Sequence, residues 1–174
     1  MTHYGFLSTF PPTRCGLATF TESLSDALVL GGDEDGTIVR VLDQPEDRRR
    51  YDPRARSRVR THLIADDRLS TMRATMALNA CDVAIVQHEY GIYGGRDGDQ
   101  VLEVLAAMRI PTIVVLHTVL VAPTPHQREV LTEVCRLASV VVVMTSHARD
   151  NLAAHYAVDL ARVHVIPHLS LIHI

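Results

Sequence analysis

Short apolar runs alternate along this chain with longer segments in which apolar residues recur every three or four positions. The short runs predict buried strands, and the longer segments predict helices that cover them. Strands are expected at 4–9, 37–42, 59–64, 82–87, 112–116, 139–144 and 163–166. Most of these runs are apolar at nearly every position, which indicates strands buried on both faces of a parallel sheet.

The helical segments lie between these strands. Apolar residues at Leu17, Phe20, Leu24, Ala27 and Leu28 predict the first helix, which Gly31 and Gly32 would end. Further helices are expected near 69–80, 101–108 and 127–137, and from an N-cap at Ser146 to Tyr156. The alternation of strands and helices predicts an α/β fold: a doubly wound, Rossmann-like parallel sheet with right-handed crossovers.

Composition narrows the class of protein. The chain has 174 residues, 47% hydrophobic and 21% charged, which suits one globular domain. Its net charge of -3 gives no electrostatic reason to expect nucleic acid as a partner. No apolar run approaches the ~20 residues that cross a bilayer. Three widely spaced cysteines without a CxxC pair indicate reduced thiols, so we expect a cytoplasmic protein.

Ligands of an open parallel sheet bind beyond the carboxyl ends of the strands, which directs attention to the loops at 8–16, 87–98 and 117–127. In the first loop, Arg14 and Gly16 precede a helix whose N–H groups could face a phosphate. An ordinary strand–helix turn is an equal alternative. Neither GxGxxG nor GxxxxGK[ST] is present, so the sequence does not favour a dinucleotide site or a P-loop.

The second and third loops carry polar residues at expected strand ends. His88 and Glu89 follow a buried strand and precede a flexible, glycine-rich loop, a suitable place for a polar ligand such as a sugar. His117 comes directly after another apolar strand and could donate to a hydroxyl or transfer a proton. The alternatives are structural histidines and a solvated glutamate. The ten histidines show no HExxH or other metal-ligand spacing, so no metal site is predicted.

Five segments in order resemble the N-terminal domain of GT-B glycosyltransferases, closest to the retaining family-4 type. They are STFPPTRCGLATF, VQHEYGIYGG, PTIVVLHTVL, VVVMTSHARDNLAAHY and VHVIPH. The resemblance implies a Rossmann-like, acceptor-side domain of a sugar-nucleotide-dependent transferase. It also implies no metal and no cofactor beyond the sugar nucleotide, which is the donor substrate. The glycosyl acceptor would be a carbohydrate, a phosphorylated sugar or a lipid-linked sugar.

The resemblance also assigns roles to residues. It implies that Gly16 approaches the donor diphosphate and that His117, the candidate catalytic residue, lies close to the transferred sugar. His88 and Glu89 would line the same cleft, and Arg14 would face the acceptor.

The same family places its donor site in a second domain that supplies an Arg, a Lys and a Glu–x7–Glu element. This chain contains no lysine. After Val-Ile-Pro-His the family continues with Gly and a linker, whereas residues 169–174 read Leu-Ser-Leu-Ile-His-Ile, which matches a reading frame of a sequencing adapter. We therefore expect one domain at 1–168, a non-native tail at 169–174, a missing donor domain and negligible activity alone. The alternative is a non-catalytic Rossmann-like module that binds carbohydrate or phosphate.

One basic cluster stands apart from these motifs. It consists of Arg48, Arg49, Arg50, Arg54, Arg56, Arg58 and Arg60. A solvated loop is the simplest interpretation. The functional alternative is contact with an anionic acceptor or with the inner face of a membrane, at ~1 kcal/mol per residue near the surface.

Overall fold

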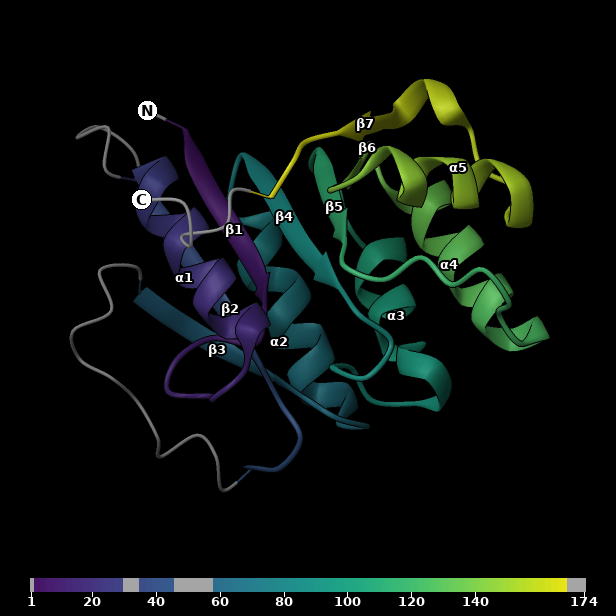
Figure 1. Cartoon of the computed structure of the whole chain (residues 1–174). Coiled ribbons are helices and arrows are strands. Elements are labelled where there is room, and N and C mark those ends of the chain that lie inside the picture. Colours follow the sequence, from purple (N-terminus) through teal and green to yellow (C-terminus); the bar gives the residue numbers. More distant parts are fainter. Residues whose placement is uncertain (1, 30–34, 46–57, 169–174) are drawn as a thin grey trace.

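The computed structural model describes residues 2–29, 35–45 and 58–168. These residues form a seven-stranded sheet in the order β3-β2-β1-β4-β5-β6-β7, with all neighbouring strands parallel (Figure 1). The strands are β1 (His3–Ser8), β2 (Asp35–Leu42), β3 (Arg58–Ile64), β4 (Val83–His88), β5 (Thr112–Leu116), β6 (Val140–Val143) and β7 (Val163–Val165). The predicted parallel α/β, Rossmann-like fold is confirmed.

The helices cover both faces of this sheet. They are α1 (Gly16–Val29), α2 (Arg68–Asn79), α3 (Gln100–Ala106), α4 (Pro125–Leu137) and α5 (Ser146–His155). The chain runs outward from β1 to β3, returns through α2 to β4, and then continues to β7 on the other side. With right-handed crossovers, this reversal places α1 on one face and the other helices on the opposite face (Figure 1). The strand order therefore reverses between β1 and β4, where such folds bind ligands.

Polar side chains cap the N-termini of α2, α4 and α5. Asp67 caps α2 by accepting from the N–H of Leu69 at 3.0 Å. Thr124 opens α4 through a capping box with Gln127. The N-cap of α5 is Thr145, which accepts from the N–H of Ala148 at 3.0 Å. The prediction of Ser146 as this cap is wrong by one residue, because the β-branched Thr145 holds the extended conformation that a cap requires.

The buried side of α1 differs from the predicted apolar stripe. Its buried residues are Ala18, Thr21 and Ser25, while Ala27 is exposed. Small side chains allow the helix to lie close to the sheet, and Thr21 satisfies its hydroxyl by donating to Ser8 Oγ at 2.8 Å. Of the larger apolar residues predicted for this helix, Leu24 and Leu28 are partly buried and pack against the apolar layer of the sheet.

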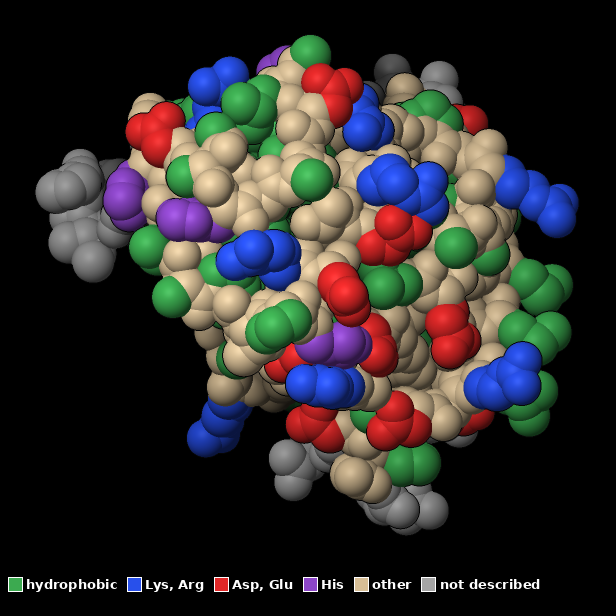
Figure 2. Space-filling view, turned by 90° about the vertical axis from the view of Figure 1, so that its right-hand side faces the viewer, with side chains coloured by type: hydrophobic (Ala, Val, Ile, Leu, Met, Phe, Trp, Pro, Cys, Tyr) green, Lys and Arg blue, Asp and Glu red, His purple; other side chains and the backbone are tan. Residues whose placement is uncertain are grey.

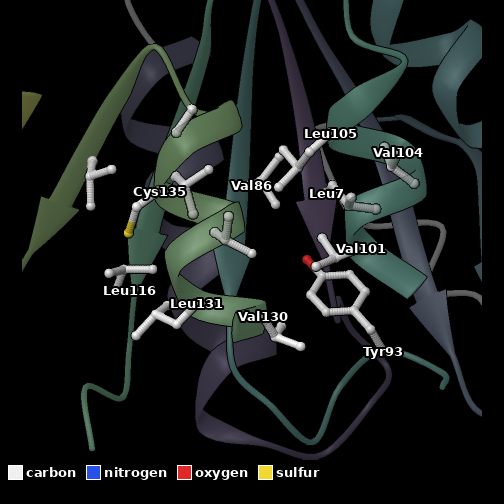
Figure 3. Close-up of a cluster of buried hydrophobic side chains, with 14 of the residues drawn as sticks. Leu7, Val86, Tyr93, Val101, Val104, Leu105, Leu116, Val130, Leu131 and Cys135 are labelled. Carbon is white, nitrogen blue, oxygen red and sulfur yellow. The ribbon is translucent and has the colours of Figure 1, made fainter. Parts of the chain in front are cut away.

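Two apolar layers enclose the sheet. On the face of α2, α3 and α4, Leu105 of α3 and Val130 of α4 belong to one apolar cluster with Leu7 of β1 and Val86 of β4 (Figure 3). On the face of α1, a smaller layer contains Phe6, Ile38, Ile85, Val115 and Val142. Ile85 and Val115 of this second layer stand two positions before Gln87 and His117 in the chain.

The face of the molecule that carries α4 and α5 has no single dominant charge. On the face with α4 and α5, acidic and basic side chains are interspersed (Figure 2). Cys15 is exposed, whereas Cys81 and Cys135 are buried. In the described part of the chain, no helix is long and apolar enough to span a bilayer.

Three sequence predictions fall wholly or partly outside the described residues. These concern the helix end at Gly31 and Gly32, the tail at 169–174, and most of the arginine cluster. Arg58 begins β3, and Arg60 on the same strand is exposed. The membrane and anionic-acceptor hypotheses for this cluster stay predictions.

Replacing Leu131 with Ala should lower the free energy of unfolding by about 2–5 kcal/mol, because its side chain is fully buried between α4 and the sheet and truncation leaves a cavity. Met76→Ala on α2 is the control, since Met76 is 71% exposed and its loss should change stability by less than about 0.5 kcal/mol. Urea titration measures both values. Equal effects of the two substitutions would show that α4 does not pack as described.

Candidate functional site

Three loops meet at the carboxyl edge of the sheet because all its strands are parallel. Between them is a hollow of about 460 Å³ on the α1 side, which we call the α1 hollow. Its lining residues are Gly16, Leu17, Phe20, Glu89, His117 and His168. It thus brings together three of the residues that the sequence singled out, from the ends of β1, β4 and β5.

Gly16 is the first residue of α1 and forms one wall of the α1 hollow. A Cβ placed on Gly16 would meet no atom within 4 Å, so the fold itself does not require glycine here. The turn before it is held by Cys15, whose sulfur accepts from the N–H of Ala18 at 3.4 Å. No hydrogen bond joins the N–H groups of Gly16 and Leu17 to other described residues. This end of the helix is therefore open to an anion.

Arg14 lies in the same turn and is exposed. It is not among the residues that line the α1 hollow. Its predicted role in facing an acceptor therefore has no support from its position.

His117 stands on the opposite wall. Its Nε2 lies 2.7 Å from Gln87 Oε1, and the ring meets Phe20 edge-on with ring centroids 5.1 Å apart. Burial, and then the nearby His168, lower the pKa of His117 from 6.5 to about 4. At neutral pH the ring is therefore uncharged, and it can form hydrogen bonds with a polar ligand without the free-energy cost of burying a charge.

Glu89 is half-buried and is fixed by both of its oxygens. Oε1 accepts from the N–H of Tyr90 at 3.1 Å, and Oε2 accepts from the hydroxyl of Thr118. A carboxylate has about four lone-pair positions, so these two bonds leave capacity for a ligand hydroxyl. Glu89 is thus an oriented hydrogen-bond acceptor in the α1 hollow.

His88 was expected to line the same cleft, but the structure does not place it there. Strand β4 continues through His88, one residue farther than predicted, so alternation turns its side chain away from the neighbouring Gln87. The ring is fully buried and packs edge-on against Tyr90 at 5.2 Å. Neither ring nitrogen has a hydrogen-bond partner among the described residues. Burial, followed by His117, lowers its pKa from 6.5 to about 4.

The glycine-rich loop after β4 is packed, which contradicts the expected flexibility. The hydroxyl of Tyr93 donates to Gln87 O at 2.6 Å, and Gly95 N donates to Asp66 Oδ1 at 2.8 Å. Gly98 has a φ of 76°, and a Cβ there would lie 2.7 Å from Tyr90 O. These glycines permit tight turns and close backbone contact.

Several residues of the site were not predicted. Phe20 was assigned to the core of the first helix, yet its ring lies between His117 and His168 and stacks on His168 with centroids 5.1 Å apart. His168 reaches the α1 hollow because β7 is parallel to the other strands and ends at the same edge. Apolar periodicity gave no signal for Phe20, since a residue facing a hollow and one facing a core have the same spacing.

A larger hollow of about 580 Å³ lies between α2 and α3, beside Asn79, Ala107 and Arg109. These residues adjoin the beginnings of β4 and β5, at the edge opposite to the one where such sheets bind ligands. The α1 hollow is therefore the better candidate. In the described ranges, no group of three or more His, Cys, Asp or Glu side chains is arranged to hold a metal ion.

The lowered pKa of His88 predicts acid-sensitive stability. The folded protein keeps this ring neutral down to about pH 4, whereas the unfolded chain protonates it near 6.5. The contribution of His88 to the free energy of unfolding is fully present above pH 6.5. It falls by up to about 3 kcal/mol as the pH drops toward 4. His88→Leu should remove that part of the loss, as seen in urea titrations between pH 7.5 and 4.5.

The control is Met76→Leu, because Met76 is exposed on α2 and has no group that binds a proton in this range. It should lose free energy of unfolding on acidification as wild type does. If His88→Leu and wild type lose the same free energy of unfolding on acidification, the buried position of His88 is wrong.

No protein-family model matches the chain. No curated protein matches it in sequence. Among solved structures, the chain is similar to the crystal structure of Anabaena Alr3699/HepE in complex with UDP and glucose, with a TM-score of 0.64 at 12% sequence identity. The match covers 96% of this chain and 44% of that one, so this chain spans less than half the length of its structural neighbour. At this identity, the likeness establishes the α/β fold that the two chains share.

Proposed function

We propose that this chain is the acceptor-side half of a GT-B glycosyltransferase, retaining and dependent on a sugar nucleotide, with residues 1–168 as its domain. The observation that supports this most directly is the α1 hollow, in which Gly16, Glu89 and His117 converge at the carboxyl edge of the sheet. A structural neighbour crystallised with UDP and glucose is consistent with it.

The open end of α1 suits the diphosphate of a sugar nucleotide. Unpaired N–H groups and the positive end of the helix dipole favour anions. Because no atom lies within 4 Å of a Cβ placed on Gly16, phosphate oxygens could approach the backbone there.

The opposite wall suits a sugar. Glu89 offers oriented carboxylate oxygens to hydroxyl groups, and neutral His117 adds a hydrogen-bonding edge. The rings of Phe20 and His168 provide the flat surfaces on which a sugar packs. In this proposal His117 lies nearest the transferred sugar, and the site uses no metal and no cofactor beyond the donor.

Charge stabilisation is the part of the chemistry that this half does not supply. Transfer from a nucleotide diphosphate builds negative charge on the leaving group, and pre-placed cationic groups must stabilise it. Among the residues that the structure describes, no Arg lines the α1 hollow, and the sequence has no lysine. We propose that a separate donor domain provides these groups, so this chain alone binds ligands without catalysing transfer.

Gly16→Ala tests the diphosphate contact. The added methyl group should weaken binding of UDP, measured by calorimetric titration, by about tenfold or more, because it occupies the space that phosphate oxygens would enter. Thermal stability should stay the same or rise slightly, since alanine favours a helix over glycine.

Gly91→Ala is the matched control, because a Cβ on Gly91 also meets no atom within 4 Å and Gly91 does not line the α1 hollow. It should bind UDP like wild type. Equal affinity of wild type and Gly16→Ala for UDP would count against a diphosphate at this helix end.

A turnover assay distinguishes the proposed transferase function from the alternative of a non-catalytic module that binds carbohydrate or phosphate. The isolated chain should release no UDP from UDP-glucose above the background rate, since it lacks the cationic groups described above. Coupled detection of free UDP measures this, and measurable release would contradict the proposed division between two domains. If the chain joined to a cationic donor domain also stays inactive while still binding ligand, the binding-module alternative is favoured.

A further inference from the structure

Two polar side chains, Gln87 and His117, stand on the α1 face of the sheet just beyond its apolar layer. Ile85 and Val115 belong to that layer, and each polar residue follows two positions later along the same strand direction. The N–H of His117 donates to His88 O at 3.0 Å, which continues the ladder between β4 and β5. Backbone pairing between β4 and β5 therefore fixes the backbone positions from which the side chains of Gln87 and His117 extend.

The contact between them determines which nitrogen of His117 carries hydrogen. Gln87 Oε1 is a carbonyl oxygen and can only accept, so His117 Nε2, at 2.7 Å, must be the donor. Burial keeps the ring neutral, with a pKa of about 4, and a neutral imidazole has one N–H. Nδ1 consequently holds a lone pair, and it has no hydrogen-bond partner among the described residues.

The surroundings restrict both side chains to this arrangement. Gln87 is fully buried, and its backbone carbonyl accepts the hydroxyl of Tyr93 at 2.6 Å. The ring of His117 meets Phe20 at an interplanar angle of 84°. With its Nε2 edge engaged by a buried residue, His117 leaves its other edge to the α1 hollow.

Stability alone does not account for this polar pair. Gln87 Nε2 has no hydrogen-bond partner in the described part of the chain, and an unpaired buried amide group costs free energy. An apolar side chain of similar size would fill the same space without that cost. A polar residue at this position thus has a use other than packing.

We propose that Gln87 is a positioning residue that holds His117 in the Nε2–H tautomer, so that Nδ1 accepts a hydrogen bond from a hydroxyl of the sugar bound in the α1 hollow. This role rests on the proposed transferase function for its ligand. It extends that function by identifying the residue that determines which ring nitrogen of His117 donates and which accepts a hydrogen bond.

Long-range proton–nitrogen NMR correlation of the histidine rings tests the tautomer in the ligand-free protein. With ¹⁵N-labelled histidine at pH 7.5, His117 should show a protonated Nε2 and an unprotonated Nδ1, and its signals are assigned by their absence in His117→Gln. The two orientations of the Gln87 amide predict opposite tautomers, so a protonated Nδ1 in wild type would overturn the proposal.

Variants of Gln87 test its part in the arrangement. Gln87→Met should fold with unchanged or slightly higher stability, give a mixture of His117 tautomers, and bind glucose about tenfold more weakly. Gln87→Glu should restore the Nε2–H tautomer, because its carboxylate also accepts, and should raise the pKa of His117 above the wild-type value by its charge. A purely structural role for Gln87 would produce neither the tautomer change nor the pKa change.

Thr21→Val is the matched control. Thr21 is a buried polar residue on the same face, bonded to Ser8 rather than to His117, so its loss should leave the tautomer unchanged. An unchanged tautomer in Gln87→Met would refute the positioning role. If the tautomers behave as expected but wild type binds neither UDP nor glucose, the proposed transferase function fails while the control of His117 by Gln87 stands.

Discussion

Side chains along a strand alternate between the two faces of the sheet, and this constraint decides which polar groups of the protein reach the candidate site. At the end of β4, Gln87 points to the α1 face and His88 to the opposite one. At the end of β5, His117 follows Val115 onto the α1 face. Two histidines that belong to neighbouring strands are thereby separated by the sheet: one lines a hollow, and the other is sealed in the core. The tautomer of His117, its neutrality and its contact with Phe20 all depend on this placement.

The buried polar groups at this edge carry a cost that the apolar layers offset. Clusters of Val, Leu and aromatic residues cover both faces of the sheet, and Figure 3 shows part of the larger one. Against that background, the ring nitrogens of His88 and the amide of Gln87 are buried without partners among the described residues. Sites of chemistry often keep polar groups that packing alone would not favour. The two cases differ, because the side chain of Gln87 contacts His117 in the α1 hollow, whereas the ring of His88 packs edge-on against Tyr90.

In the proposed function, two domains share the chemistry of sugar transfer. The α1 hollow supplies an open helix end, an anchored carboxylate and a neutral histidine, which suit recognition of a polar, uncharged sugar beside an anionic group. In the part of the chain that the structure describes, no Arg or Lys lines it to stabilise a leaving diphosphate. The fold is shared, over 96% of this chain, with less than half of a protein crystallised with UDP and glucose. In the proposed function, a second domain completes the site.

The sequence by itself determined the parallel α/β fold, because apolar runs and helical periodicity are local patterns. They can be recognised without knowing which residues are in contact in the folded protein. It also placed Glu89 and His117 directly after strands and Gly16 in the loop after the first strand, and the carboxyl ends of parallel strands share one edge. It could not determine the extent of β4, on which the direction of His88 depends, because strand ends are set by pairing with β5. Only the tertiary structure brought Phe20 and His168 to the α1 hollow, placed Gln87 beneath His117, and showed the glycine loop to be packed. These contacts join residues far apart in the chain, and no local pattern encodes them.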